Sequence, residues 1–190
     1  MRMDIMEALT TRRSIRKYWN KPLSVGVLEE LLEVARYYPS GLNLQPLKFM
    51  PVTEGEDVTF VTENLRWAGY LPGYEIGVDE RPVSYILMFG DRQIGNQFDF
   101  AAGSAVNQLL LAVHGMGLGG CCLAIHKKAQ ILEHFQLDAE RFEALYAIAI
   151  GYAKHGATTT DLTTDCKYTL DENGDFVVPK RTVSELTIKK

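Results

Sequence analysis

The chain has few cysteines, and they are not arranged as a framework. Its 190 residues contain three, Cys121, Cys122 and Cys166, and two of these are adjacent. An odd number with this spacing fits neither a set of disulfides nor a tetrahedral zinc site. We therefore expect reduced thiols.

Long apolar runs are also missing. No stretch reaches the eighteen or so residues that a membrane helix needs, and the first residues lack the continuous apolar core of a signal peptide. We therefore expect a protein without a membrane partner that works in the cytoplasm.

Motifs for hydrolytic, phosphoryl-transfer or metal chemistry are not found. The four histidines form no H-E-x-x-H pair, and there is no Gly-x-Ser-x-Gly elbow, P-loop or catalytic Cys-His signature. We expect no metal site, and neither a hydrolase nor a kinase is supported. The lack of acid–base or nucleophilic groups favours a borrowed cofactor that carries the chemistry.

The composition is that of a globular protein with little overall charge. Hydrophobic residues make up 46% and charged residues 23%, and the net charge is −4. This balance gives no general attraction to nucleic acid, so we expect no nucleic-acid partner. Without repeats or a Gly/Ser-rich linker, we expect a single domain over 1–190, in which about 157–190 form a polar C-terminal extension.

Hydrophobic periodicity and capping residues predict a mixture of helices and strands. We expect helices that begin at Asp4, Ser24 and Thr182, with capping boxes to Glu7 and Glu185 at the first and last. A long buried helix is expected over 98–116 and a shorter one over 127–135. Strands are expected at 47–52, 83–89, 120–125 and 145–153, and a turn at Asn173-Gly174 joins 167–170 to 175–178.

The order of these elements does not alternate strictly, as a doubly wound parallel sheet requires. An α+β fold fits better, with a mixed, mainly antiparallel sheet and helices around the long central one. Gly115, Gly117 and Gly120 match G-x-G-x-x-G, but here the motif closes a helix and leads into a strand. A dinucleotide fingerprint must follow a strand and open a helix, so we interpret these glycines as a helix stop that allows close packing.

Three polar segments could bind a ligand. RRSIRKY at 12–18 gathers Arg12, Arg13, Ser14 and Arg16 beyond a helix end, either as a solvated basic stretch or as a site for a phosphate. PSGLNLQP at 39–46 is either a simple polar turn or a ligand-binding loop bounded by prolines. PKRTVSEL at 179–186 adds Lys180 and Arg181 beside a helix start.

Together these segments resemble the nitroreductase family of flavoproteins. Five motifs occur in the order of that family: RRSIRKY, PSGLNLQP, WAGYL at 67–71 with ERPVSYI at 80–86, GLGGC at 117–121 and VPKRTVSEL at 178–186. Each motif alone is weak, and their ordered occurrence along nearly the whole chain is what makes the resemblance specific.

The resemblance implies an α+β homodimer that forms through the long central helix and holds two FMN molecules at the subunit interface. The C-terminal extension is expected to pack on the partner, because the strand-like alternation in KYTL and DFVV needs another surface to bury Tyr168, Leu170, Phe176 and Val178. The resemblance also implies a phosphate and ribityl site made by the first motif with Lys180 or Arg181. The second motif of the partner subunit would lie along the flavin ring, and the strand after the glycine stop would present backbone groups to flavin N5. The implied cofactor-binding residues are Arg12, Arg13, Ser14, Arg16, Pro39, Ser40, Gly41, Asn43, Gln45, Cys122, Leu123, Ala124, Lys180 and Arg181.

Trp67 and Tyr70 are expected either near the flavin, as a wall for the substrate, or simply in the core. The implied reaction is ping-pong transfer of two electrons from NAD(P)H through FMN to a small acceptor such as a nitroaromatic or quinone, with no catalytic side chain. Two alternatives stay open. The fold could support another flavin reaction, namely reductive dehalogenation, enone reduction or flavin breakdown, or the protein could bind flavin without turnover.

Overall fold

The computed structural model describes residues 3–188 and confirms the α+β architecture. Five strands form the main sheet: β1 (Tyr18–Trp19), β2 (Leu47–Val52), β3 (Ser84–Asp91), β4 (Gly119–Ala124) and β5 (Phe142–Ala153). The strand order is β2-β3-β5, with β4 and β1 paired to the other edge of β5, and every pair is antiparallel. All four strands expected in this sheet are present.

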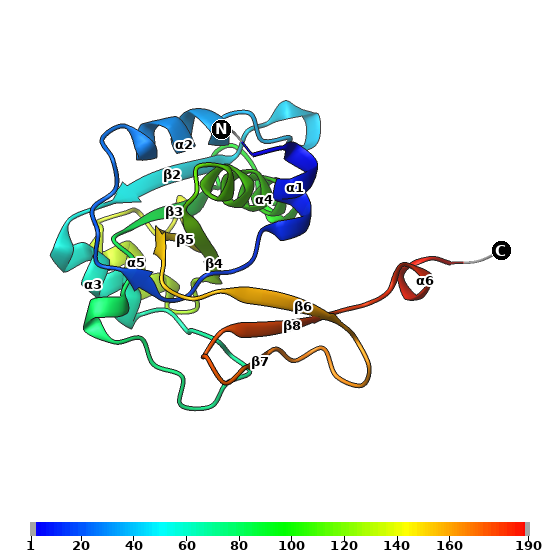
Figure 1. The fold of residues 1–190 in the computed structure, drawn as a ribbon. Helices are drawn as coiled ribbons and strands as arrows, with labels where there is room; N and C mark the ends of the chain where they lie inside the picture. The colour runs from blue at the N-terminus through cyan, green and yellow to red at the C-terminus, as the bar shows by residue number, and fades with distance from the viewer. Residues whose placement is uncertain (1–2, 189–190) are drawn as a thin grey trace.

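Helices cover both faces of this sheet (Figure 1). Ile86 and Met88 of β3 face α2 (Val27–Ala35) and α4 (Asp99–Gly115), whereas Tyr85, Leu87 and Phe89 face α3 (Gly55–Glu63) and α5 (Lys128–His134). Successive side chains of a strand point to opposite faces, so β3 is buried along its whole length. Its apolar run reflects burial on both faces.

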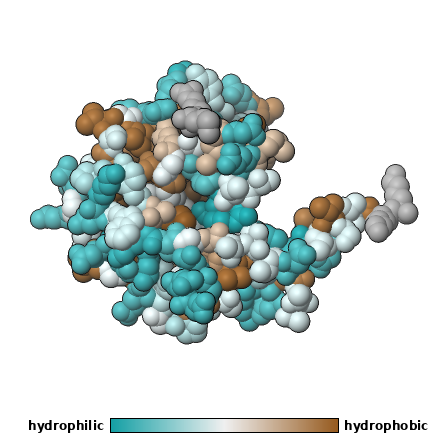
Figure 2. All heavy atoms as spheres, viewed as in Figure 1, coloured by the Kyte–Doolittle hydropathy of each residue, from teal (hydrophilic) through white to brown (hydrophobic). Residues whose placement is uncertain are grey.

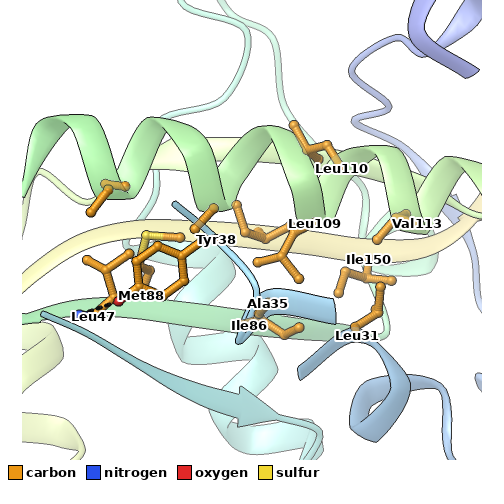
Figure 3. Packing of buried hydrophobic residues seen from close by; sticks show 14 of the residues in the cluster. Leu31, Ala35, Tyr38, Leu47, Ile86, Met88, Leu109, Leu110, Val113 and Ile150 are labelled. Atoms are coloured by element: carbon orange, nitrogen blue, oxygen red, sulfur yellow. Dashed lines mark hydrogen bonds between the residues drawn. The ribbon is translucent and has the colours of Figure 1, made fainter. Parts of the chain in front are cut away.

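The long helix α4 is the expected central helix, and Figure 3 shows Leu109 and Val113 above Ile86 and Ile150 of the sheet. Three residues after the end of α2, the hydroxyl of Tyr38 accepts a hydrogen bond from the N–H of Leu47 at 3.1 Å. Despite its apolar character, α4 is too short to span a bilayer, and the same is true of every other helix within residues 3–188.

The glycines after α4 pack as the helix-stop interpretation requires. Gly117 has a φ of +75°, which L residues rarely adopt, and the chain then turns directly into β4. A Cβ on Gly120 would lie 3.0 Å from Leu110 Cδ2, and one on Gly119 would lie 2.8 Å from Ile15 Cγ2. These residues are small because β4 approaches α4 and the segment before β1 so closely.

Helix starts were predicted with mixed success. Asp4 caps α1 (Ile5–Thr11) by accepting from the N–H groups of Met6 and Glu7, and the capping box of Thr182 with Glu185 opens α6 (Val183–Leu186). The prediction of Ser24 as a cap was wrong. The N-cap of α2 is Gly26, because a turn from the carbonyl of Ser24 to the N–H of Val27 places Gly26 at φ +86°.

The C-terminal segment forms a second, smaller sheet. β6 (Ala157–Asp161) pairs in parallel with β8 (Phe176–Lys180), and β7 (Thr169–Leu170) pairs antiparallel to β8 across the predicted turn at 173–174. Phe176 is buried against Tyr74, Tyr168 and His155 of its own chain. These aromatic contacts dock the hairpin within the subunit.

Beyond β8 the chain leaves the body. Figure 1 shows α6 standing away from both sheets at the end of an extended segment. Its apolar side chains are exposed, with Val183 at 80%, Leu186 at 70% and Ile188 at 95%, and they appear as brown spheres on the projecting arm in Figure 2. We call residues 181–188 the C-terminal arm.

Candidate functional site

A pocket of about 470 Å³ lies where the first motif meets the C-terminal sheet. We call it the basic pocket. Its walls come from the end of α1 and the segment after it, from β6 and β8, and from the residue before β7. The lining residues are Leu9, Thr10, Arg12, Arg13, Ser14, Arg16, Thr159, Tyr168, Val178 and Lys180.

Local backbone interactions place the first motif in this pocket. Helix α1 ends at Thr11, whose Oγ1 lies 2.9 Å from Nε2 of His114 near the end of α4, and Arg12 is extended at φ −56° and ψ 129°. Three residues after Arg12, the N–H of Ile15 donates to the carbonyl of Gly120 at 3.0 Å. The segment between these points is therefore fixed to α4 and β4.

The charges of the basic pocket have no acidic partner among the described residues. Within residues 3–188, Arg12, Arg13, Arg16 and Lys180 take part in no ion pair, and the pocket has no acidic side chain in its lining. Burial and the nearby guanidinium of Arg13 lower the pKa of Arg12. The buried Nε of Arg13 has no hydrogen-bond acceptor among the described residues. Buried donors without acceptors are costly, so the arrangement fits an anion such as a phosphate.

Arg16 also connects the two parts of the pocket. Its guanidinium carbon lies 4.7 Å from the ring centre of Tyr168 and 4.6 Å from that of Phe176. Cation–π contacts of this kind are worth roughly 0.5–2 kcal/mol. They hold the C-terminal hairpin against the first motif and thereby bring Lys180 to the same pocket.

The hydrogen bonds of β4 show in which direction the backbone groups of Cys122, Leu123 and Ala124 point. The carbonyl of Gly120 faces away from β5, because it accepts from Ile15, whereas the N–H of Ile125 donates to Leu145 of β5. Backbone groups of a strand alternate in direction. Those of Cys122 and Ala124 therefore point to the outer edge of β4, and those of Leu123 point into the sheet.

A larger hollow of about 920 Å³ lies at the other end of α4, and we call it the α4 pocket. Ser40 and Gly41 line it together with the start of α4. Leu42, Asn43 and Gln45 all have φ between 52° and 56°, although none is a glycine. Ser40 holds this conformation, since its Oγ accepts from the N–H of Gln45 at 3.0 Å. Strain of this kind is concentrated at functional sites.

One subunit does not bring the two predicted halves of the site together. The pockets share no lining residue and lie at opposite ends of α4, a helix of 17 residues and thus roughly 26 Å long. The basic pocket adjoins its C-terminal end through Thr11 and His114, and the α4 pocket contains Asp99 and Phe100 of its first turn.

The remaining predicted residues divide between the basic pocket and other places. Lys180 lines the basic pocket, whereas the exposed Arg181 does not and lies 4.0 Å from Glu185. Tyr70 packs against Tyr168 with the rings tilted by 57° and their centres 5.2 Å apart. Trp67 packs against the core and donates to the carbonyl of Thr62 at 3.2 Å.

Sequence reasoning missed Thr159, Tyr168 and Val178 as lining residues of the basic pocket. Tyr168 and Val178 were expected to be buried, but against a partner subunit. Their alternation in KYTL and DFVV was the available signal, although it predicts burial without saying against what. The described residues contain no cluster of three or more side chains suited to a metal ion.

The fold and the basic pocket define an α+β protein with a pocket lined by three arginines and a lysine. A model of the nitroreductase family matches residues 9–152, three quarters of the chain, and the chain belongs to that family. It is 26% identical over 166 residues to a candidate NADH dehydrogenase/NAD(P)H nitroreductase from Methanothermobacter thermautotrophicus, covering 85% of this chain and 83% of the relative.

Solved structures share the fold. A candidate nitroreductase from Desulfovibrio desulfuricans, in complex with FMN, aligns with a TM-score of 0.74 and 24% identity, covering 100% of this chain and 98% of that chain. An FMN-dependent nitroreductase from Clostridium difficile aligns with a TM-score of 0.69 and 20% identity, covering 84% and 92%. The family and the fold expected from the motifs are thus confirmed.

Proposed function

We propose that the protein is an FMN-dependent NAD(P)H oxidoreductase that passes two electrons to a small acceptor, such as a nitroaromatic or a quinone, by a ping-pong mechanism. The uncompensated charge of the basic pocket carries this proposal. Membership of the nitroreductase family, and relatives named for FMN and NAD(P)H, support it.

The described residues fit the parts of FMN. Arg12, Arg13, Ser14 and Arg16 would hold the phosphate, and the unsatisfied Nε of Arg13 would gain an acceptor there. Lys180 would add a fifth contact. From Gly120, beside Ser14, the outer edge of β4 leads to Ala124 over roughly 13 Å, so it could carry the ribityl chain and the ring.

When bound, FMN supplies hydride chemistry at N5, accepting from NAD(P)H and giving two electrons to the acceptor. The outward backbone groups of Cys122 and Ala124 would orient the ring. No side chain of the protein needs to exchange a proton. For a nitroaromatic the balance is ArNO2 + NAD(P)H + H⁺ → ArNO + H2O + NAD(P)⁺.

We also propose a homodimer in which each flavin is shared. The partner's loop 39–46 would cover the ring with Pro39, Ser40, Gly41, Asn43 and Gln45, because the loop of the same chain lies at the far end of α4. The C-terminal arm would pack on the partner, since Val183, Leu186 and Ile188 are exposed on their own subunit. A shared site makes flavin binding and dimerisation depend on each other.

The test is reconstitution of the full chain with FMN, followed by anaerobic addition of NADH or NADPH. We expect the flavin absorption to bleach and to return when a nitroaromatic or quinone is added. Initial rates should give parallel double-reciprocal lines. If FMN binds but its absorption never bleaches with NADH or NADPH, the protein only binds flavin. If the protein retains no FMN, the cofactor assignment is refuted.

A further inference from the structure

The α4 pocket contains features that the phosphate site does not explain. Its lining includes the apolar side chains of Leu42, Leu44 and Phe100, which are 94%, 50% and 67% exposed. The hollow of about 920 Å³ is large enough for a small molecule, and polar and apolar groups share its lining about equally. Asn96 and Gln97 contribute amide groups to the same wall.

The charged groups of this pocket are all of one sign. Asp99 and Glu143 are its two charged lining residues, and no lysine, arginine or histidine lines it. Glu143 is compensated, since it binds Arg92 at 3.3 Å and Lys128 at 2.6 Å, and these cations hold the pKa of its carboxyl below the usual value. Neither Arg92 nor Lys128 belongs to the lining.

Asp99 is different, because among the described residues it has no ion-pair partner. It lies in the first turn of α4, where the helix dipole amounts to about half a positive charge. A full negative charge exceeds that half charge. Asp99 is thus an exposed carboxylate in the pocket lining, and no ion pair among the described residues offsets its charge.

We infer that the α4 pocket is the acceptor subsite and that it selects uncharged aromatic acceptors over anionic ones, with Asp99 as the discriminating residue. The inference rests on the proposed function, because it assumes that Ser40 and Gly41 lie along the partner's flavin. The apolar side chains in the lining would accept a planar ring, and the amides of Asn96 and Gln97 would donate to its nitro or carbonyl oxygens. An acceptor that carries a carboxylate brings a second negative charge close to Asp99.

The test compares 4-nitrobenzamide with 4-nitrobenzoate on the FMN-loaded protein. The two differ mainly in charge, and their rates with free reduced FMN correct for intrinsic reactivity. We expect the wild type to have at least about a tenfold higher corrected kcat/KM for the amide, the size of effect that one nearby charge produces at an intermediate dielectric.

The matched variants are Asp99→Asn and Glu56→Gln. Both remove one negative charge from the first turn of a helix, but Glu56 begins α3 and does not line the pocket. Asp99→Asn should narrow the preference by about 3- to 10-fold, and Glu56→Gln should leave it unchanged. Asn96→Lys adds a cation to the lining and should, like Asp99→Asn, reduce the preference for the amide over the benzoate. This second variant keeps the test decisive if Asp99→Asn folds poorly.

Binding of non-reducible analogues separates this inference from the proposed function. Benzamide should perturb the absorption of oxidised flavin at lower concentration than benzoate, and Asp99→Asn should reduce the difference. If NAD(P)H never bleaches the flavin, the proposed function fails while this binding test still applies. Equal effects of Asp99→Asn and Glu56→Gln, or a wild type that prefers the anion, would overturn the inference.

Discussion

The backbone N–H of Arg16 donates to Nε2 of His155 at 2.8 Å, so a neutral histidine fixes the segment that carries the basic cluster. Nδ1 of the same ring lies 2.7 Å from the carbonyl of Gly156 and must hold the proton. Burial lowers the pKa of His155. The nearby charges of Arg16 and Lys17 act in the same direction, whereas Asp175 and the Gly156 carbonyl oppose it.

This hydrogen bond predicts a loss of stability in mild acid. The folded pKa of His155 lies below the unfolded value of about 6.5, so the unfolded chain binds more protons. The contribution of neutral His155 to the free energy of unfolding is complete above about pH 6.5 and falls as the pH drops toward the folded pKa. Urea unfolding at several pH values should show this decline, with a smaller slope in His155→Gln. The pKa of His114 is also lowered, so His114→Gln measures the part of the slope that comes from that histidine. An unchanged slope in His155→Gln would contradict the assignment to His155.

Arg12→Ala and Arg13→Ala should each weaken FMN binding by about 1.5–3 kcal/mol, the usual range for a charge-assisted hydrogen bond. Flavin content after gel filtration and a fluorescence titration with FMN measure the effect. Arg66→Ala is the matched control, because Arg66 is exposed and lies outside the basic pocket. Full flavin retention in both variants would show that the cluster is a solvated basic stretch.

At position 42, glycine should give a more stable protein than alanine, which is the reverse of the usual order. Leu42 has a φ of 52° and is exposed, so Leu42→Ala keeps the backbone strain and Leu42→Gly relieves it. We expect Leu42→Gly to be more stable than Leu42→Ala by about 0.5–1 kcal/mol. Chemical denaturation of the two variants is sufficient. Greater stability of Leu42→Ala would mean that the loop is not strained at this residue.

The C-terminal arm should hold the dimer together. The double variant Val183→Asp with Leu186→Asp places two charges on its exposed apolar side chains and should raise the dimer dissociation constant at least tenfold. Sedimentation at low micromolar concentration measures it. Thr163→Asp with Thr164→Asp adds the same charge to an exposed segment before β7. Equal dissociation in both double variants, or a monomeric wild type that is loaded with flavin, would contradict the shared-site proposal.

The three thiols should differ sharply in reactivity. Burial raises the pKa of Cys121, and it raises the pKa of Cys122 to about 12, so neither forms appreciable thiolate at pH 8. Cys166 is exposed. Iodoacetamide at pH 8 should therefore modify Cys166 alone in the native protein, as mass spectrometry of its peptides would show. Early modification of Cys122 would mean that the outer edge of β4 opens readily.

Local signals in the sequence determined most of the secondary structure. The strand at 47–52, the apolar run of α4, the turn at 173–174 and the capping box at Thr182 depend on residues that are neighbours in the chain, and all were predicted. Gly26 shows the limit of such reasoning. Ser24 was equally suitable as a cap, but the observed turn from Ser24 to Val27 makes Gly26 the N-cap.

The composition of the site followed partly from the sequence, because the motif order identified the family and therefore the residues of the first motif. Tertiary structure decided how these residues are arranged. It brought Lys180 but not Arg181 into the lining of the basic pocket, placed Tyr70 against Tyr168 and Trp67 against the core, and turned the backbone of Leu123 away from the outer edge of β4. It also placed the 39–46 loop at the far end of α4. These outcomes depend on contacts between residues far apart in the chain, such as Arg16 with Phe176 and Ile15 with Gly120, which no local pattern records.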